Sequence, residues 1–186
     1  MRYNSETDMI EIYYNGEWKE WKSASLQAFY LYKDGNEIVD VTNGWSSVKY
    51  DGDDYYNSSL VSITKATTYI ELTTYSPNTT YENIGTILLY TTNKIDLTEY
   101  SKIGIEYKLN CNNSYTNRSA NLRVSTTKPD KGVTTTSVIS LTQEDSVLYG
   151  DITNISGLQY ISIMLYNGSK STYKDILQIK RIWLCN

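Results

Sequence analysis

Apolar and polar residues alternate with a period of two along most of this chain, which restricts it to β-structure more than any other feature. Successive side chains of a strand point to opposite faces, so this period predicts strands that bury one face. The segment KIGIEYKLN shows the pattern most clearly. The residues that share one of its faces are Ile103, Ile105, Tyr107 and Leu109. The segment LQYISIMLYN (158–167) is apolar on both faces, which predicts a strand at the centre of a sheet.

Short segments of this kind follow one another to the end of the chain, and no segment has a clear helical period. We predict strands at 59–64, 68–74, 84–92, 94–100, 102–110, 120–127, 133–141, 146–153, 158–167 and 175–185. The chain has 19 Tyr, one Phe and only two Pro, a composition that suits strands. Clusters of Asn, Asp, Gly and Ser separate the segments. We therefore predict an all-β protein built around an antiparallel β-sandwich of two sheets.

The N-terminal segment MRYNSETDMIEIYYNGEWKEW predicts a β-hairpin, because Asn15-Gly16 lies between two strand-like runs. We divide the chain into an attachment segment, 1–37, and a sandwich, 38–186. A lone two-stranded hairpin is marginally stable, so its aromatic side chains must pack against the sandwich, a sister chain or another protein. The residues that we predict to make this attachment or oligomer contact are Tyr14, Trp18 and Trp21.

Charge and composition exclude several classes of function. The net charge is −4 and no basic run occurs, so we predict no nucleic-acid partner. No apolar stretch approaches 18 residues, which argues against a membrane span. The chain has no His, which excludes the usual zinc sites and Ser-His-Asp or Cys-His catalysis. Carboxylates such as Asp53, Glu82 and Glu144 are available for glycoside hydrolysis, but nothing selects a pair, so we predict that the protein is not an enzyme.

Two parts of the chain resemble known families. The N-terminal hairpin resembles one common in bacteriophage tail proteins and tail fibres. The residues that carry this resemblance are Arg2, Tyr3, Asn4, Thr7, Tyr14, Asn15, Gly16 and Trp18. The segments TTNKIDLTEYSKIGIEYKLN and DILQIKRIWL resemble jelly-roll sandwiches of the galactose-binding and carbohydrate-binding-module kind. This second resemblance covers roughly residues 38–186.

Together the resemblances imply a non-enzymatic tail or baseplate-associated protein of a phage or prophage, displaying a sandwich for contact with host-surface glycan. Its partners would be other tail proteins or itself, with a trimer favoured. The alternative is a free-standing bacterial carbohydrate-binding module. We prefer the first because no apolar segment typical of a secretory signal follows Met1, so we expect a virion protein assembled in the cytoplasm. In that compartment we expect Cys111 and Cys185 to be free thiols.

Three loops combine Tyr with Asp, Asn or Arg, the side chains that sugar recognition needs. The candidate glycan-binding residues are Tyr50, Asp53, Tyr55 and Tyr56 in the first loop, Asn113, Tyr115 and Arg118 in the second, and Tyr173 in the third. The other interpretation is that these are ordinary turn residues.

The run DGDD in the first of these loops is the one candidate metal site. Clustered carboxylate oxygens suit Ca²⁺, and Asp51, Asp53 and Asp54 would supply them. The other interpretation is a solvated acidic loop. We predict no other cofactor.

Overall fold

A computed structural model describes residues 2–4, 9–14, 16–20, 28–37, 45–51, 61–75, 85–111, 118–130, 133–167 and 174–186. This part of the chain forms strands and no helix. The strands are β1 (Arg2–Asn4), β2 (Met9–Tyr14), β3 (Glu17–Glu20), β4 (Phe29–Lys33), β5 (Asn36–Glu37), β6 (Trp45–Asp51), β7 (Val61–Lys65), β8 (Ile70–Tyr75), β9 (Gly85–Thr91), β10 (Ile95–Asp96), β11 (Lys102–Asn110), β12 (Arg118–Ser125), β13 (Thr136–Ser140), β14 (Asp145–Asp151), β15 (Leu158–Asn167) and β16 (Lys174–Cys185). No helix in the described residues is long and apolar enough to cross a lipid bilayer.

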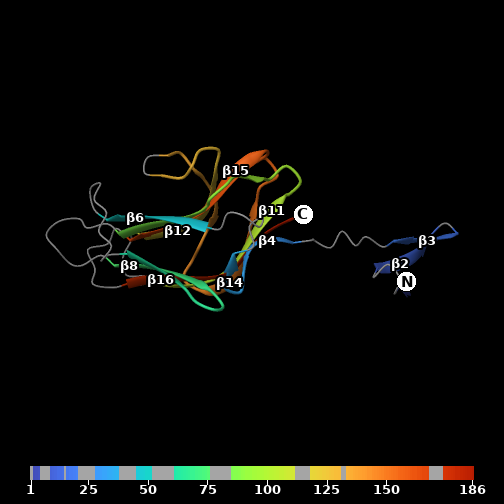
Figure 1. The fold of residues 1–186 in the computed structure, drawn as a ribbon, viewed down its shortest axis with the longest axis horizontal. Helices are drawn as coiled ribbons and strands as arrows, with labels where there is room; N and C mark the ends of the chain where they lie inside the picture. The colour runs from blue at the N-terminus through green and yellow to red at the C-terminus, as the bar shows by residue number, and fades with distance from the viewer. Residues whose placement is uncertain are drawn as a thin grey trace.

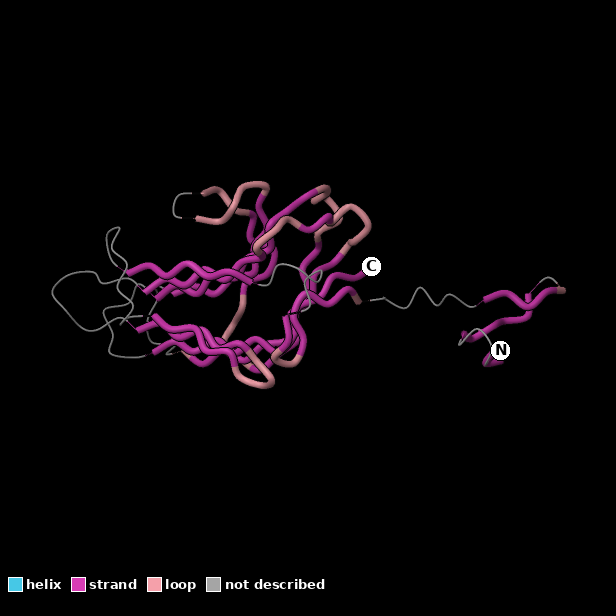
Figure 2. Tube along the Cα trace, viewed as in Figure 1, coloured by secondary structure: helices cyan, strands magenta, loops and turns pink. Residues whose placement is uncertain are grey.

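Two antiparallel sheets form the sandwich (Figures 1 and 2). One, here called the β15 sheet, has the order β13-β12-β15-β9-β6, with β10 also paired to β15. The other, the β16 sheet, has the order β14-β11-β16-β4-β5, and β8 and β7 extend it beside β16. The predicted all-β sandwich is therefore confirmed. The predicted central strand is confirmed as well, because β15 lies between β12 and β9.

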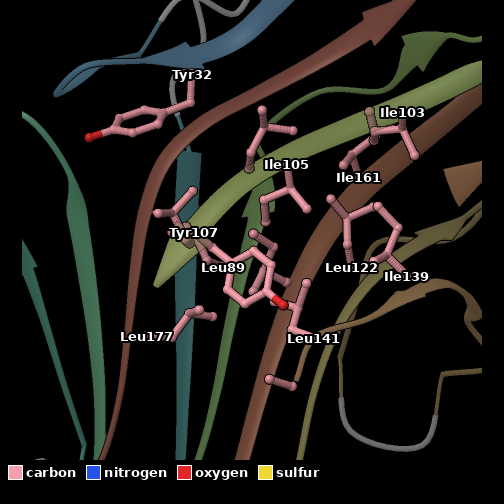
Figure 3. Close-up of a cluster of buried hydrophobic side chains, with 14 of the residues drawn as sticks. Tyr32, Leu89, Ile103, Ile105, Tyr107, Leu122, Ile139, Leu141, Ile161 and Leu177 are labelled. Atoms are coloured by element: carbon pink, nitrogen blue, oxygen red, sulfur yellow. The ribbon is translucent and has the colours of Figure 1, made fainter. Parts of the chain in front are cut away.

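The core lies between the two sheets and is filled by the inward face of each strand (Figure 3). All four residues predicted to share one face of β11 are buried there, and β15 contributes Ile161, Ile163 and Leu165. Full burial of such a side chain contributes about 1.5–3 kcal/mol. The period-two pattern of the sequence therefore accounts directly for the core.

The hydroxyl of Tyr107 enters this core and is satisfied there. The Tyr107 hydroxyl donates to the Thr142 carbonyl at 3.2 Å and accepts from the Thr142 amide at 3.1 Å. A buried hydroxyl without such partners would cost free energy. The two hydrogen bonds connect β11 to the segment between β13 and β14.

The N-terminal hairpin is present, and β1 adds a third strand to it. Tyr14 pairs with Glu17, so two residues connect the strands, and Gly16 has the positive φ of 83° that such a turn requires. Strands β4 and β5, which the predicted division places before residue 38, pair within the β16 sheet. The division into domains stays a prediction, but these two strands belong to the sandwich by their hydrogen bonding.

The two cysteines lie at opposite ends of β11. Cys185 pairs with Lys102 at the first residue of the strand, and Cys111 follows its last residue. Nine strand residues separate them, about 30 Å at about 3.4 Å per residue. A disulfide requires Cα atoms less than about 7 Å apart, so no disulfide joins the two cysteines, as expected.

Candidate functional site

The outer face of the β16 sheet carries a row of three aromatic side chains that crosses the strands. In the strand register, Tyr149 of β14 is opposite Gly104 of β11, Gly104 is opposite Trp183 of β16, and Trp183 is opposite Tyr30 of β4. These positions alternate with the buried ones, so their side chains point away from the core. We call Tyr149, Trp183 and Tyr30 the aromatic row.

Gly104 makes room for the middle of the row. A Cβ atom at this position would lie 2.3 Å from Cε2 of Trp183, 2.4 Å from Cζ2 and 2.7 Å from Nε1. The ring-fusion carbon is the nearest atom, so the indole covers the glycine with its face. A glycine inside a strand often marks a close approach of this kind. The Trp183 ring therefore lies flat against the outer surface of the sheet, and the residue is only 9% exposed.

Tyr149 and Tyr30 lie on either side of the Trp183 ring. The Tyr149 ring stands at 82° to the indole with 5.6 Å between centroids, and the Tyr30 ring is tilted at 48° with 6.2 Å between centroids. Tyr149 is 57% exposed. Edge-to-face pairs at these separations are favourable, so the rings hold one another while Tyr149 remains open to solvent.

A network of charged side chains lies next to the aromatic row. Arg181 Nε is 2.7 Å from Glu106 Oε2, and Lys180 Nζ is 3.6 Å from Glu106 Oε1. Lys180 Nζ is also 3.3 Å from Asp145 Oδ1, and Arg181 Nε is 3.9 Å from Asp34 Oδ1. We call these five residues the charged network.

A β-bulge in β16 allows both cations of the network to reach one carboxylate. The register with β11 shifts between Glu106 and Tyr107, because Lys180 is an extra residue between Arg181 and Ile179. Bulges commonly redirect a side chain in this way. Desolvation lowers the pKa of Arg181, but the charges of Glu106 and Asp34 and the hydrogen bonds with Glu106 and Tyr30 together raise it above its usual value.

Together these two groups offer the contacts that a saccharide uses. An aromatic surface packs against the apolar C–H face of a sugar ring, and carboxylate, ammonium and guanidinium groups exchange hydrogen bonds with its hydroxyls. Lys33 extends the polar edge, with its Nζ 4.7 Å from the Tyr30 ring centroid. The site is open and lies on strands, which hold side chains in fixed positions.

The described strand ends next to the predicted glycan loops lie at one end of the sandwich. Asp51, Gly85, Asn167 and Arg118 are neighbours across the β15 sheet. Gly85 lies against Thr74 of the other sheet, since a Cβ there would be 3.2 Å from Thr74 Cβ. The ends of β6, β12 and β15 therefore meet, and Figure 1 shows this end of the sandwich.

Most of the predicted loop residues lie outside the described residues. These are Asp53, Asp54, Tyr55, Tyr56, Asn113, Tyr115 and Tyr173. Tyr50, Asp51 and Arg118 are placed by their backbone in β6 and β12. Their glycan-binding role, and the Ca²⁺ site at Asp51, Asp53 and Asp54, stay predictions. Within the described residues, no group of three or more His, Cys, Asp or Glu side chains is placed to hold a metal ion.

The predicted attachment residues are described in part. Trp18 and Tyr13 are partners across the hairpin, and both are exposed. Their ring centroids are 5.3 Å apart. Tyr14 is placed by its backbone in β2, and Trp21 lies outside the described residues. Attachment through this hairpin stays a prediction.

The aromatic row was not among the predicted sites, although the sequence carries two signals for it. Tyr149 falls on the outward face of an alternating strand, and so does Trp183, two residues after Arg181. Gly104 is a residue without a side chain between two isoleucines of a strand. The sequence could not show that Tyr30 lies beside Trp183, because the two paired residues are more than 150 positions apart in the chain.

Comparison with known proteins gives a fold and no family. No protein-family model and no curated protein matches the chain. Among solved structures, a family 29 carbohydrate-binding module from Piromyces equi superposes with a TM-score of 0.51 at 13% identity, covering 87% of this chain and 92% of that one. A mutant of the module CBM29-2 in complex with mannohexaose gives 0.51 at 9% identity, covering 86% and 92%. The chain therefore has a β-sandwich fold like that of these carbohydrate-binding modules.

Proposed function

We propose that this protein is a non-catalytic carbohydrate-binding module that holds a saccharide on the outer face of its β16 sheet. The observation that carries the proposal is the aromatic row, which places Tyr149, Trp183 and Tyr30 side by side next to the charged network. Tyr149 and Tyr30 would pack against sugar rings, and Glu106, Arg181 and Lys180 would bond the hydroxyls.

The likeness to family 29 modules supports this proposal. One of those modules was solved with mannohexaose, and variants made to probe ligand recognition replace aspartates and a tyrosine. The same classes of side chain gather on the outer face of the β16 sheet here. This likeness favours the alternative prediction, a carbohydrate-binding module, over a phage tail protein, for which the comparisons offer no support. The virion location, the tail partners and the trimer stay predictions.

Binding of neutral oligosaccharides tests the proposal. Isothermal titration with mannohexaose and with cellohexaose should show binding by the full chain. Tyr149→Ala should weaken it about tenfold, which corresponds to about 1.4 kcal/mol, because it removes the most exposed ring of the row.

Val147→Ala is the matched control, since Val147 lies two residues away on the same face of β14 and is 48% exposed. It should bind as the unchanged protein does. Equal losses in both variants would contradict the proposal, and so would the absence of binding across a panel of neutral polysaccharides.

A further inference from the structure

The outer face of the β15 sheet has a different character from that of the β16 sheet. Arg123 of β12 is opposite Ser162 of β15, and Ser162 is opposite Tyr90 of β9. These positions alternate with core residues, so the three side chains form a row on the outside of the sheet. Strands β9, β12, β13 and β15 contain no Asp and no Glu, and the acids of this sheet are Asp51 at the end of β6 and Asp96 in β10.

Arg123 is a half-buried cation without a carboxylate. Its Nη1 donates to the Thr135 hydroxyl at 3.2 Å, and no carboxylate within the described residues pairs with it. Among the described residues, neither its buried Nε nor the hydroxyl of the fully buried Ser162 has a hydrogen-bond partner. Burial lowers the pKa of Arg123 by disfavouring its charge. A buried charge normally has a partner of opposite sign, so this position calls for an anion.

Two lysines add positive charge around this row. Lys128 Nζ lies 5.5 Å from the centroid of Tyr90, and Lys94 Nζ lies 5.8 Å from the centroid of Tyr160. Neither lysine is in an ion pair with a carboxylate among the described residues. On the opposite sheet, by contrast, Lys180 and Arg181 are both neutralised by carboxylates.

Asp96, the acid nearest to Lys94 along the chain, is bound within its own turn. It is exposed, and its carboxylate accepts from the amide and hydroxyl of Thr98. The chain has a net charge of −4, yet Arg123, Lys94 and Lys128 lie on or beside this one sheet face.

We propose that the outer face of the β15 sheet is a second saccharide contact, which recognises a carboxylate or sulfate group of an acidic polysaccharide through Arg123. The guanidinium is the group best suited to bind such an anion through two parallel hydrogen bonds. Lys128 and Lys94 add attraction on either side, and Tyr160 offers a ring beside them. That the ligand is a saccharide rests on the proposed function, whereas recognition of the anion rests on Arg123 and its surroundings.

Binding of acidic glycans by the full chain tests this inference. The probes are polygalacturonate and chondroitin sulfate, titrated at one fixed ionic strength, with mannohexaose as the neutral probe. We expect at least one acidic probe to bind. Arg123→Gln should weaken that binding at least tenfold and leave mannohexaose binding unchanged. Arg123→Lys should recover part of the lost affinity, because lysine restores the positive charge but cannot form the two parallel hydrogen bonds of a guanidinium.

Lys108→Gln is the charge-matched control, since Lys108 is exposed on the opposite sheet. If it weakens acidic binding as much as Arg123→Gln does, the attraction is general and the inference is wrong. Failure of both acidic probes to bind also overturns it. If Arg123→Gln lowers the thermal midpoint, Lys128→Gln, in the segment that follows β12, provides an independent test. An unchanged affinity of Lys128→Gln for the acidic probe would count against the site.

The two proposals fail separately. Loss of mannohexaose binding in Tyr149→Ala, with acidic binding retained, assigns the neutral ligand to the β16 sheet alone. Acidic binding without any neutral binding would refute the proposed function and leave the Arg123 site standing.

Discussion

The indole of Trp183 covers Gly104 with its face, so a strand residue that has no side chain sets the position of the aromatic row. Gly104 is opposite Tyr149 on one side and Trp183 on the other. The row therefore depends on the sheet register as well as on the rings themselves.

Replacement of Gly104 by alanine should displace the indole. The added Cβ would lie 2.3 Å from Cε2 of Trp183, and overpacking of this kind costs about 1–3 kcal/mol. Urea denaturation should show that loss of unfolding free energy, and saccharide binding should fall with it. Lys108→Ala, at an exposed outward position of the same strand, should stay within about 0.5 kcal/mol. A Gly104→Ala protein as stable as the original would show that the indole does not rest on Gly104.

Replacement of Tyr107 by phenylalanine should destabilise the core. It removes a hydroxyl that donates to the Thr142 carbonyl and accepts from the Thr142 amide. The Thr142 amide is part-buried at this bond, and leaving such a group without a partner costs up to about 1–3 kcal/mol. Chemical denaturation measures this loss directly. An unchanged unfolding free energy would mean that water replaces the hydroxyl without cost.

Protonation of Asp151 should occur at a lower pH than for an ordinary aspartate. Its carboxylate accepts from the Thr153 hydroxyl at 2.5 Å and from the Thr153 amide at 2.8 Å, and these bonds lower its pKa. A pKa that is lower in the folded than in the unfolded state stabilises the fold above the unfolded pKa, and this contribution is lost as the pH falls through the folded pKa.

Thr153→Val should raise the Asp151 pKa toward the normal value of about 3.9, because it removes the first of these bonds. Carboxyl resonances followed by NMR across an acid titration would report the change. Identical titration curves for the two proteins would refute the role of the hydroxyl.

Both thiols should remain free under oxidising conditions. Cys111 and Cys185 lie at opposite ends of β11, so the folded chain cannot join them. Thiol titration of the denatured protein should find two reactive groups, and the thermal midpoint should not change with reductant. A drop of the midpoint on reduction would contradict the strand arrangement.

The elements of the sandwich could be predicted from the sequence because burial of one face imposes a period of two. Ile103, Ile105, Tyr107 and Leu109 were placed on one face for this reason. The hairpin turn at Asn15-Gly16 could be predicted because few dipeptides adopt its backbone angles.

The site could not be predicted in the same way, because it depends on pairing between distant strands. Tyr30 joins Trp183 only through the pairing of β4 with β16, and Arg123 joins Ser162 only through the pairing of β12 with β15. Periodicity gives the face on which each residue lies but says nothing of its neighbour on the next strand. For the same reason, the prediction favoured loop residues, which are close together in the sequence, over strand residues that the fold brings together.

The most direct test of the central claim is an NMR titration of the full chain with mannohexaose, following backbone amides and indole NH groups. The account predicts that the largest shift changes fall on Tyr149, Gly104 and Trp183, with smaller ones at Glu106 and Arg181. Changes confined to the other end of the sandwich, around Asp51 and Arg118, would instead support the loop residues predicted from the sequence. That result would contradict a saccharide site on the aromatic row. The absence of any chemical-shift change up to the solubility limit of mannohexaose would contradict it as well.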